Sequence, residues 1–396
     1  MTAPPLPHPL NPDMADTAAP PVMEAQRWLA ARGPGGPPLI NVSQAAPVAP
    51  PPEPLRRFMA DAVLNDPTVH LYGPDLGHPP LREEIARQWA QSYGGEIAPA
   101  QVAVTSGCNQ AFTAALATLA RAGDEVILPT PWYFNHKMYL DMCGIRALPL
   151  PTGDDLLPDP THAAALITDR TRALVLVTPN NPAGVEYPAA VTRAFFELAK
   201  SRRLALIIDE TYRDFDARPG APHDLFEDPN WPETLIHLYS FSKAFRLTGH
   251  RVGAIVAAEA RLAQVEKYID SVTICPNQLG QRAALWGLRN LTQWLAGERA
   301  EILDRRAAVT EALGTLPGWR LRGCGAYFAY VEHPFDLPSD VLAQRLICDH
   351  GILLLPGTMF VPKGDASGRR ALRLAFANID RAGIAALRER LENLTL

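Results

Sequence analysis

The runs ALVLVT (residues 173–178), LALII (204–208) and LIHLY (235–239) decide the fold class of this sequence. Each run is continuously apolar rather than alternating, which is typical of strands that are buried on both faces. Helical patterns separate the runs, for example over Ala189–Arg202. Buried strands that alternate with helices predict an α/β fold with a mostly parallel central sheet flanked by helices.

The runs QVAVT (101–105), EVIL (125–128) and VGAIVA (252–257) extend the same pattern on both sides. From about residue 295 the order of elements changes, and we expect a smaller α+β domain there. Its predicted elements are the helix Ala296–Leu313, the strand Tyr327–Val331, the helix Ser339–His350, the strand Ala371–Ala375 and the helix Ile384–Leu394.

Proline is unusually frequent at 39 of 396 residues, and 15 of these prolines lie within the first 54 residues. Because proline removes an amide donor and fixes φ, Met1–Pro21 is predicted to be an extended arm without helix or strand. A short helix is expected over Val22–Arg32. The predicted division is therefore an arm and the start of the small domain (1–54), a large domain (55–294) and a small C-terminal domain (295–396).

Composition excludes several classes of protein. The formal net charge is −5, so nothing indicates a nucleic-acid partner or an anionic membrane surface. A hydrophobic fraction of 47% in a chain of this length excludes overall disorder and a small disulfide scaffold.

Cysteine usage and the termini indicate a compartment. The five cysteines are spread singly with no C-x-x-C pair, so we expect no metal site, and isolated thiols fit a reducing compartment. The N-terminus has no basic stretch before an apolar core, and no run of 18 apolar residues exists. The expected location is the cytoplasm, without a membrane span.

Polar residues concentrate where the predicted strands end, which is where open α/β sheets bind ligands. Asn181, Asp209 and Lys243 each follow a strand, and the turn Ser106–Asn109 opens a helix. The amino end of a helix is a natural seat for a phosphate. A lysine, a carboxylate and a phosphate seat in one crevice suit a cofactor bound as an imine, with a protonated ring nitrogen and a phosphate.

Four ordered motifs carry a resemblance to a known family. Ser240–Gly253 (SFSKAFRLTGHRVG) resembles the lysine signature S-x-S-K-x-F-x-x-x-G-x-R-x-G of the class I/II aminotransferases, which are pyridoxal 5'-phosphate (PLP) enzymes of fold type I. Asn181–Gly184 (NPAG), Asp209–Tyr212 (DETY) and Arg373–Ala377 (RLAFA) resemble three further motifs of that family. The spacings of eight residues from Lys243 to Arg251 and 28 from Asn181 to Asp209 also match the family.

The resemblance implies roles for the central residues. Lys243 would carry PLP as a Schiff base and then move a proton from the substrate Cα to the cofactor. Asp209 would keep the ring nitrogen protonated. Asn181 and Tyr212 would donate hydrogen bonds to the phenolate oxygen of the ring, and Asn181 would also lie beside the substrate.

The resemblance also implies how phosphate and substrate are held. Arg373 would bind the substrate α-carboxylate as a bidentate pair. Cys108 stands where the family more often has Gly or Ser, and we interpret its side chain as packing rather than as a nucleophile. The phosphate would be held by Arg251, Ser240 and the cradle of Gly107, Cys108 and Asn109.

Three further positions bear on the cofactor ring, the substrate entrance and the subunits. Tyr133 resembles the aromatic residue that stacks on the cofactor, although Trp132 is the alternative. Tyr72 resembles the tyrosine that reaches the phosphate of a neighbouring subunit, which implies a homodimer with shared active sites. Ala45 stands in a substrate-facing loop where the family often has Gly, so the entrance is expected to differ in shape.

The predicted activity is transfer of an amino group from an L-amino acid to a 2-oxo acid. Aromatic residues over Pro131–Tyr139 favour a neutral or aromatic donor, while Arg246, His136 and Lys137 are candidates for recognising a second carboxylate. A β-lyase acting on cysteine conjugates, or a related elimination, is the alternative on the same scaffold. A ligand-sensing regulator is disfavoured because the Pro-rich start is too short for a DNA-binding domain.

Overall fold

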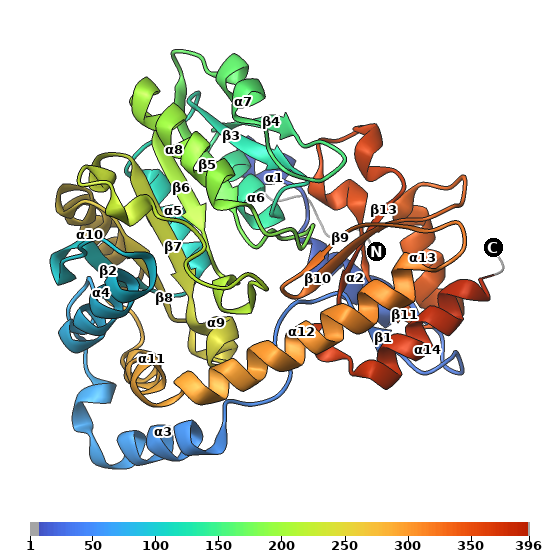
Figure 1. Ribbon diagram of the computed structural model, residues 1–396, viewed down its shortest axis with the longest axis horizontal. Coiled ribbons are helices and arrows are strands. Elements are labelled where there is room, and N and C mark those ends of the chain that lie inside the picture. The colour runs from blue at the N-terminus through green and yellow to red at the C-terminus, as the bar shows by residue number, and fades with distance from the viewer. Residues whose placement is uncertain (1–7, 395–396) are drawn as a thin grey trace.

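The computed structural model describes residues 8–394. Its largest sheet has seven strands in the order β2-β8-β7-β6-β5-β3-β4 (Figure 1). Only β8 runs antiparallel to its neighbours, so the sheet is mostly parallel, as predicted. The strands are β2 (Val102–Thr105), β3 (Glu125–Thr130), β4 (Arg146–Pro151), β5 (Thr171–Val177), β6 (Ala205–Asp209), β7 (Leu235–Ser240) and β8 (Gly253–Val256).

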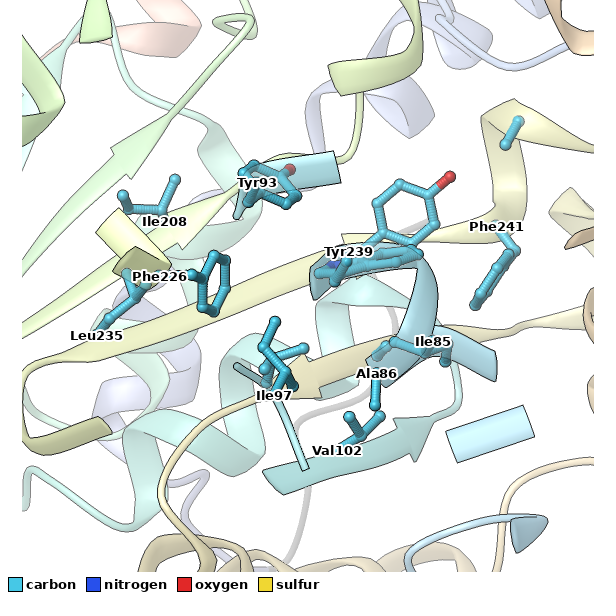
Figure 2. Close-up of a cluster of buried hydrophobic side chains, with 14 of the residues drawn as sticks. Ile85, Ala86, Tyr93, Ile97, Val102, Ile208, Phe226, Leu235, Tyr239 and Phe241 are labelled. Atoms are coloured by element: carbon cyan, nitrogen blue, oxygen red, sulfur yellow. The ribbon is translucent and has the colours of Figure 1, made fainter. Parts of the chain in front are cut away.

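Both faces of this sheet are buried under helices, which confirms the interpretation of the apolar runs. Along β6, Leu206 and Ile208 join one core, whereas Ala205 and Ile207 join the core on the opposite face. Figure 2 shows part of the first core, where Tyr93, Phe226 and Tyr239 gather against the strands. The first face is covered by α3 (Glu53–Asn65), α4 (Pro79–Tyr93), α7 (Pro160–Leu166), α8 (Ala189–Arg202) and α11 (Gln278–Asn290), and the second by α5 (Cys108–Ala117), α6 (Phe134–Met142) and α10 (Glu259–Thr273).

A smaller antiparallel sheet lies beside the large one, in the order β12-β13-β10-β9. The helix α12 (Thr292–Gly314) extends from α11 across to this sheet and to α14 (Figure 1). The N-terminal strand β1 (Ile40–Asn41) pairs in parallel with β11 (Ile352–Leu353). The remaining elements are β9 (Arg320–Gly325), β10 (Phe328–Glu332), β12 (Leu355–Pro356), β13 (Ala371–Ala375), α13 (Ser339–His350) and α14 (Arg381–Glu392). The boundaries at residues 54 and 294 stay a prediction.

The expectation of an arm without regular structure over Met1–Pro21 was wrong. Residues 1–7 lie outside the described residues, but Pro12–Asp16 form the helix α1, which packs against α6. Proline is tolerated at the first helical position, where its missing N–H costs nothing, and Asn11 caps the helix by accepting from the Asp13 amide at 3.0 Å. The next helix, α2, spans Pro21–Ala31 and again begins on a proline.

Among residues 8–394, no helix is long and apolar enough to cross a membrane.

Candidate active site

The predicted site residues meet at the carboxyl ends of β2, β5, β6 and β7. There they line a cavity of about 250 Å³ between the two sheets. This is the crevice in which the parallel part of such a sheet is expected to bind a ligand. The predicted residues that line it are Cys108, Asn109, Tyr133, Asn181, Asp209, Tyr212, Ser240, Lys243 and Arg251.

Lys243 lies on α9 (Phe241–Ala244), a short helix that directly follows β7. The Ser240 hydroxyl oxygen caps this helix by accepting from the Ser242 amide at 3.2 Å. The Lys243 Nζ lies 5.8 Å from the centre of the Tyr212 ring and donates to none of the residues that the structure describes. Burial, together with the charges of Arg251 and Arg373, lowers the pKa of Lys243 to about 8. A neutral amine is therefore accessible near physiological pH, and the neutral form is the nucleophile.

Asp209, the last residue of β6, is a buried carboxylate that also lines the cavity, with 3% of its surface exposed. The Thr211 amide donates to its Oδ1 at 3.0 Å, and His136 Nε2 lies 3.4 Å from its Oδ2. Burial alone would raise the pKa of Asp209, but His136 and the Thr211 hydrogen bonds outweigh that effect and lower it. Asp209 therefore presents a negative charge to the cavity at neutral pH.

Another part of the cavity lining is suited to bind an anion, because a guanidinium and the amino end of a helix lie there. Arg251 Nη1 donates to Ser242 Oγ at 3.4 Å and to the Thr248 carbonyl at 3.2 Å. Beside it, α5 begins at Cys108, so the first amides of this helix point into the cavity. Gly253 permits this approach, because a Cβ there would come within 2.8 Å of the Cys108 amide nitrogen.

Gly107 is held at φ +84°, and a Cβ at this position would lie 2.2 Å from Arg251 Nη2. We expect Gly107→Ala to displace the Arg251 guanidinium and to raise the dissociation constant for PLP by about tenfold or more, since a lost charge-assisted contact costs roughly 1.5–3 kcal/mol. The measurement is a titration of the apoprotein with PLP. The control is Gly123→Ala, which has the same backbone strain at φ +88° but no atom within 4 Å of the new Cβ. Equal losses in the two variants would contradict the role of Arg251.

Arg373, on β13 of the smaller sheet, is 2% exposed and does not itself line the cavity, but it contacts the lining residue Asn181. Its Nη1 donates to Asn181 Oδ1 at 3.2 Å, its Nη2 donates to the Ser43 carbonyl, and its Nε has no partner among the described residues. Burial lowers the pKa of Arg373 to about 10, so the guanidinium remains charged at neutral pH.

The structure shows which of the aromatic and entrance residues considered from the sequence line the cavity. Tyr133 lines the cavity and donates to Asn109 Oδ1 at 3.3 Å, whereas Trp132 lies in the core behind it. Ala45 does not line the cavity, because it packs in the core of the smaller sheet, and its neighbours Gln44 and Ala46 face the cavity instead. Tyr72 is 78% exposed and lies away from the cavity of its own chain.

Each of the three residues considered for binding a second substrate carboxylate already contacts an acidic side chain of this chain. Arg246 Nη2 pairs with Glu298 Oε2 at 2.6 Å, and Lys137 Nζ pairs with Asp141 Oδ1 at 2.5 Å. His136 is buried, stacks on the Phe112 ring at 3.8 Å between centroids and contacts Asp209. His136 is therefore positioned to act on Asp209 rather than on a substrate carboxylate.

Sequence reasoning missed several residues of the site. His136 had no local signal for contact with Asp209, because the two are joined only by the packing of α6 against the sheet. Ser242 could have been found, since it is the second serine of the S-x-S-K motif. The cavity is also lined by Thr211, Thr248, Gln44, Ala46 and Val177.

The residues present fit PLP. The cavity lining combines an anion seat, an ionised and buried carboxylate, and a buried amine with a lowered pKa. The partnerless Nε of Arg373 leaves a donor for a carboxylate.

Comparisons with known proteins agree with this geometry. The sequence profile described as aminotransferase class I and II matches residues 37–391. The chain is 30% identical to the aromatic aminotransferase ISS1 of Arabidopsis thaliana over 83% of this chain and 84% of that protein. It is 32% identical to the arginine–pyruvate transaminase AruH of Pseudomonas aeruginosa over 82% of each chain.

Solved structures agree as well. YbdL of Escherichia coli, reported with a methionine aminotransferase function, superposes with a TM-score of 0.88 at 25% identity over 98% of this chain and all of that one. The aspartate aminotransferase of Thermus thermophilus, solved with maleate, gives 0.88 at 25% identity over 97% of this chain and 99% of that one.

Proposed function

Because the chain belongs to the class I and II aminotransferases, which use PLP to transfer amino groups between amino acids and 2-oxo acids, we propose that it performs this reaction in the cavity that joins Lys243 and Asp209. The observation that carries the assignment is the convergence of a buried amine, a buried carboxylate and an anion seat at one edge of the sheet. When bound there, PLP supplies an aldehyde that condenses with amino groups and a ring that accepts negative charge from the substrate Cα.

The residues of the cavity have separate proposed roles in this reaction. Lys243 would hold the cofactor through Nζ, and its free amine would move the proton of the substrate Cα. Asp209 holds the proton on the ring nitrogen, and His136 keeps Asp209 ionised and oriented. Arg251, Ser240 and the first amides of α5 hold the phosphate.

Substrate is positioned from the smaller sheet. Arg373 binds the α-carboxylate and so fixes the direction of the Cα–H bond with respect to Lys243. Asn181 orients the guanidinium through its Oδ1. Tyr133 and Tyr212 both line the cavity, where Tyr133 would stack on the ring and Tyr212 would donate to its phenolate oxygen. Their burial raises the pKa of both tyrosines, so they act as neutral hydroxyl donors.

A neutral amino donor fits this chain better than a dicarboxylate one. Arg246 and Lys137 are neutralised by Glu298 and Asp141, so they offer no free charge to a second carboxylate. The relatives' printed names include aromatic, arginine and aspartate or prephenate activities, and the family alone does not fix the donor.

The test is the visible absorbance of the purified holoenzyme during addition of single L-amino acids. We expect methionine, phenylalanine or another neutral amino acid to bleach the band at least tenfold faster than aspartate, since an unpaired carboxylate in the side-chain site loses roughly 1.4 kcal/mol or more. Addition of a 2-oxo acid should restore the band.

Two results would contradict the proposal. Fastest bleaching by aspartate would overturn the neutral donor. Release of pyruvate and ammonia without any need for a 2-oxo acid would move the assignment to the β-lyase alternative.

We further propose a homodimer in the cytoplasm. Leu71 and Tyr72 are 63% and 78% exposed, and Ile274 lies near them because the Gly73 amide donates to Cys275 Sγ at 3.4 Å. An exposed apolar patch of this kind suits a second copy of the chain. All five cysteines are free thiols, which fits a reducing compartment. Sedimentation measurements at several concentrations test the dimer, and a monomer throughout would exclude it.

A further inference from the structure

A cluster of buried polar side chains lies on the face of the sheet opposite the active site. Because successive residues of a strand point to opposite faces, Asp209 faces the cavity and Glu210 faces the core under α4. Glu210, His223 and His237 are each at most 1% exposed. Figure 2 shows this face, with Tyr93 near the strand residue Ile208 and Phe226 near Leu235.

The donors of this cluster converge on the Glu210 carboxylate. Tyr93 donates its hydroxyl to Oε2, and His237 Nε2 lies 2.8 Å from the same oxygen. His223 Nε2 lies 3.6 Å from Oε1, beyond hydrogen-bond distance, and neither atom has a hydrogen-bond partner among the described residues. Burial acts to raise the pKa of Glu210, but His223, His237 and Tyr93 lower it to about 2, so the group is an anion.

One carboxylate and two histidines within 4.8 Å have the composition of a metal site. The hydrogen bonds argue against a metal. The Trp89 indole N–H donates to His237 Nδ1 at 3.4 Å, and the Leu225 amide donates to His223 Nδ1 at 3.3 Å. Each Nδ1 is therefore an acceptor, which places the ring proton on Nε2, toward Glu210. A metal-bound histidine would instead donate from its second nitrogen.

The backbone of Glu210 joins this cluster to the active site. Its amide donates to the Leu238 carbonyl at 2.9 Å, and its carbonyl accepts from the Arg213 amide at 3.1 Å. The hydrogen bond from Arg213 to the Glu210 carbonyl thus closes the turn that contains Tyr212. Arg213 extends back over the Trp89 ring at 3.5 Å and donates to the Tyr93 hydroxyl at 3.1 Å.

We propose that Glu210 is a positioning residue for transamination. Glu210 is held by Tyr93 and His237, with His223 beside it, and it fixes the end of β6 on the side away from the cavity. It thereby sets the placement of Asp209, which precedes it, and of Tyr212, which follows it. This inference rests on the proposed role of Asp209 at the ring nitrogen. Glu210 itself touches neither substrate nor cofactor.

The test is Glu210→Gln in the holoenzyme, which keeps the shape of the side chain but removes its charge. A misplacement of about 1 Å at reacting groups costs on the order of 10²-fold, so we expect kcat to fall by about that factor. The pH at which the visible band of the bound cofactor titrates should shift, since the charge of Asp209 beside the ring influences that titration.

The matched control is Glu125→Gln. Glu125 is also a buried glutamate of the same sheet, 2% exposed, but it lies at the amino end of β3 and pairs with Arg146 at 2.9 Å. We expect it to lose thermal stability while keeping kcat and the titration of the band. If Glu210→Gln does not fold, Tyr93→Phe, which deletes one donor, takes its place with the same readouts and a smaller shift.

Three outcomes decide between explanations. Lost stability in Glu210→Gln with unchanged kcat and band titration would overturn the positioning role. One equivalent of a divalent metal per chain, found by elemental analysis, would overturn the hydrogen-bonded arrangement. Asp209→Asn separates the two proposals: if it is impaired while Glu210→Gln is normal, only this inference fails, and if it is itself normal, the proposed site fails.

Discussion

Replacing Lys243 with alanine is expected to remove the visible band of the bound cofactor and to lower kcat by about 10⁴-fold or more. The amine would serve both as the covalent attachment point and as the general base at Cα, and general acid–base catalysis alone contributes roughly 10²–10⁴-fold. The measurements are the absorbance spectrum of the variant with added PLP and its steady-state turnover. The fold should survive, because Lys243 donates to none of the residues between 8 and 394.

The control is Lys267→Ala. Lys267 is exposed on α10 and donates only to Gln264 Oε1 at 2.8 Å. It should retain the band and the turnover of the unmodified enzyme. A small amine added to Lys243→Ala should restore part of the activity, since it can occupy the space of the missing side chain. A variant that keeps the band would show that another lysine holds the cofactor.

Replacing Arg373 with glutamine is expected to lower kcat/KM for the amino donor by about 10³-fold. Removing one partner of a buried, hydrogen-bonded charge pair costs roughly 2–5 kcal/mol. The loss should fall mainly on KM, because the carboxylate is bound in the ground state as well as in the transition state. The visible band should remain, since the residues proposed to hold the cofactor do not include Arg373. Steady-state kinetics with one neutral amino acid give both constants.

Two further variants test whether the loss depends on the shape of the guanidinium and on its position. Arg373→Lys keeps the charge but loses the planar fork, so it should recover only part of kcat/KM. Arg370→Gln is the control: Arg370 is exposed, and its Nε donates to the His333 carbonyl at 3.0 Å, outside the cavity. Equal losses in Arg373→Gln and Arg370→Gln would mean that the smaller sheet as a whole, rather than this guanidinium, matters for binding.

Sequence reasoning could predict the large sheet because its strands are buried on both faces, and burial on both faces leaves a continuous apolar run. It missed β4, whose residues Arg146–Pro151 include two prolines. Proline is acceptable there because β4 is the edge strand of the sheet and needs no hydrogen bonds on its outer side. It also missed β9, which is polar and rich in glycine and packs beside α12.

The site was predictable where its residues stand in one motif and was not where tertiary packing joins distant segments. Lys243 and Arg251 follow from their spacing in a single loop. The contact of His136 with Asp209 and the donors on Glu210 depend on how α6 and α4 pack on the sheet, which no local pattern records. The choice between Trp132 and Tyr133 likewise depends on the turn into α6, since adjacent residues there face different cores.

The pairing of β1 with β11 has a consequence for synthesis on the ribosome. Ile40 leaves the ribosome long before its neighbour Ile352 is added, because more than 300 residues separate the two. The seven strands between Val102 and Val256 can associate while the chain is still growing. The first segment must wait through all of that time with its apolar residues uncovered, because the loop it closes spans most of the chain. Lys243, the proposed cofactor lysine, is therefore synthesised well before Arg373, the residue proposed to bind the substrate.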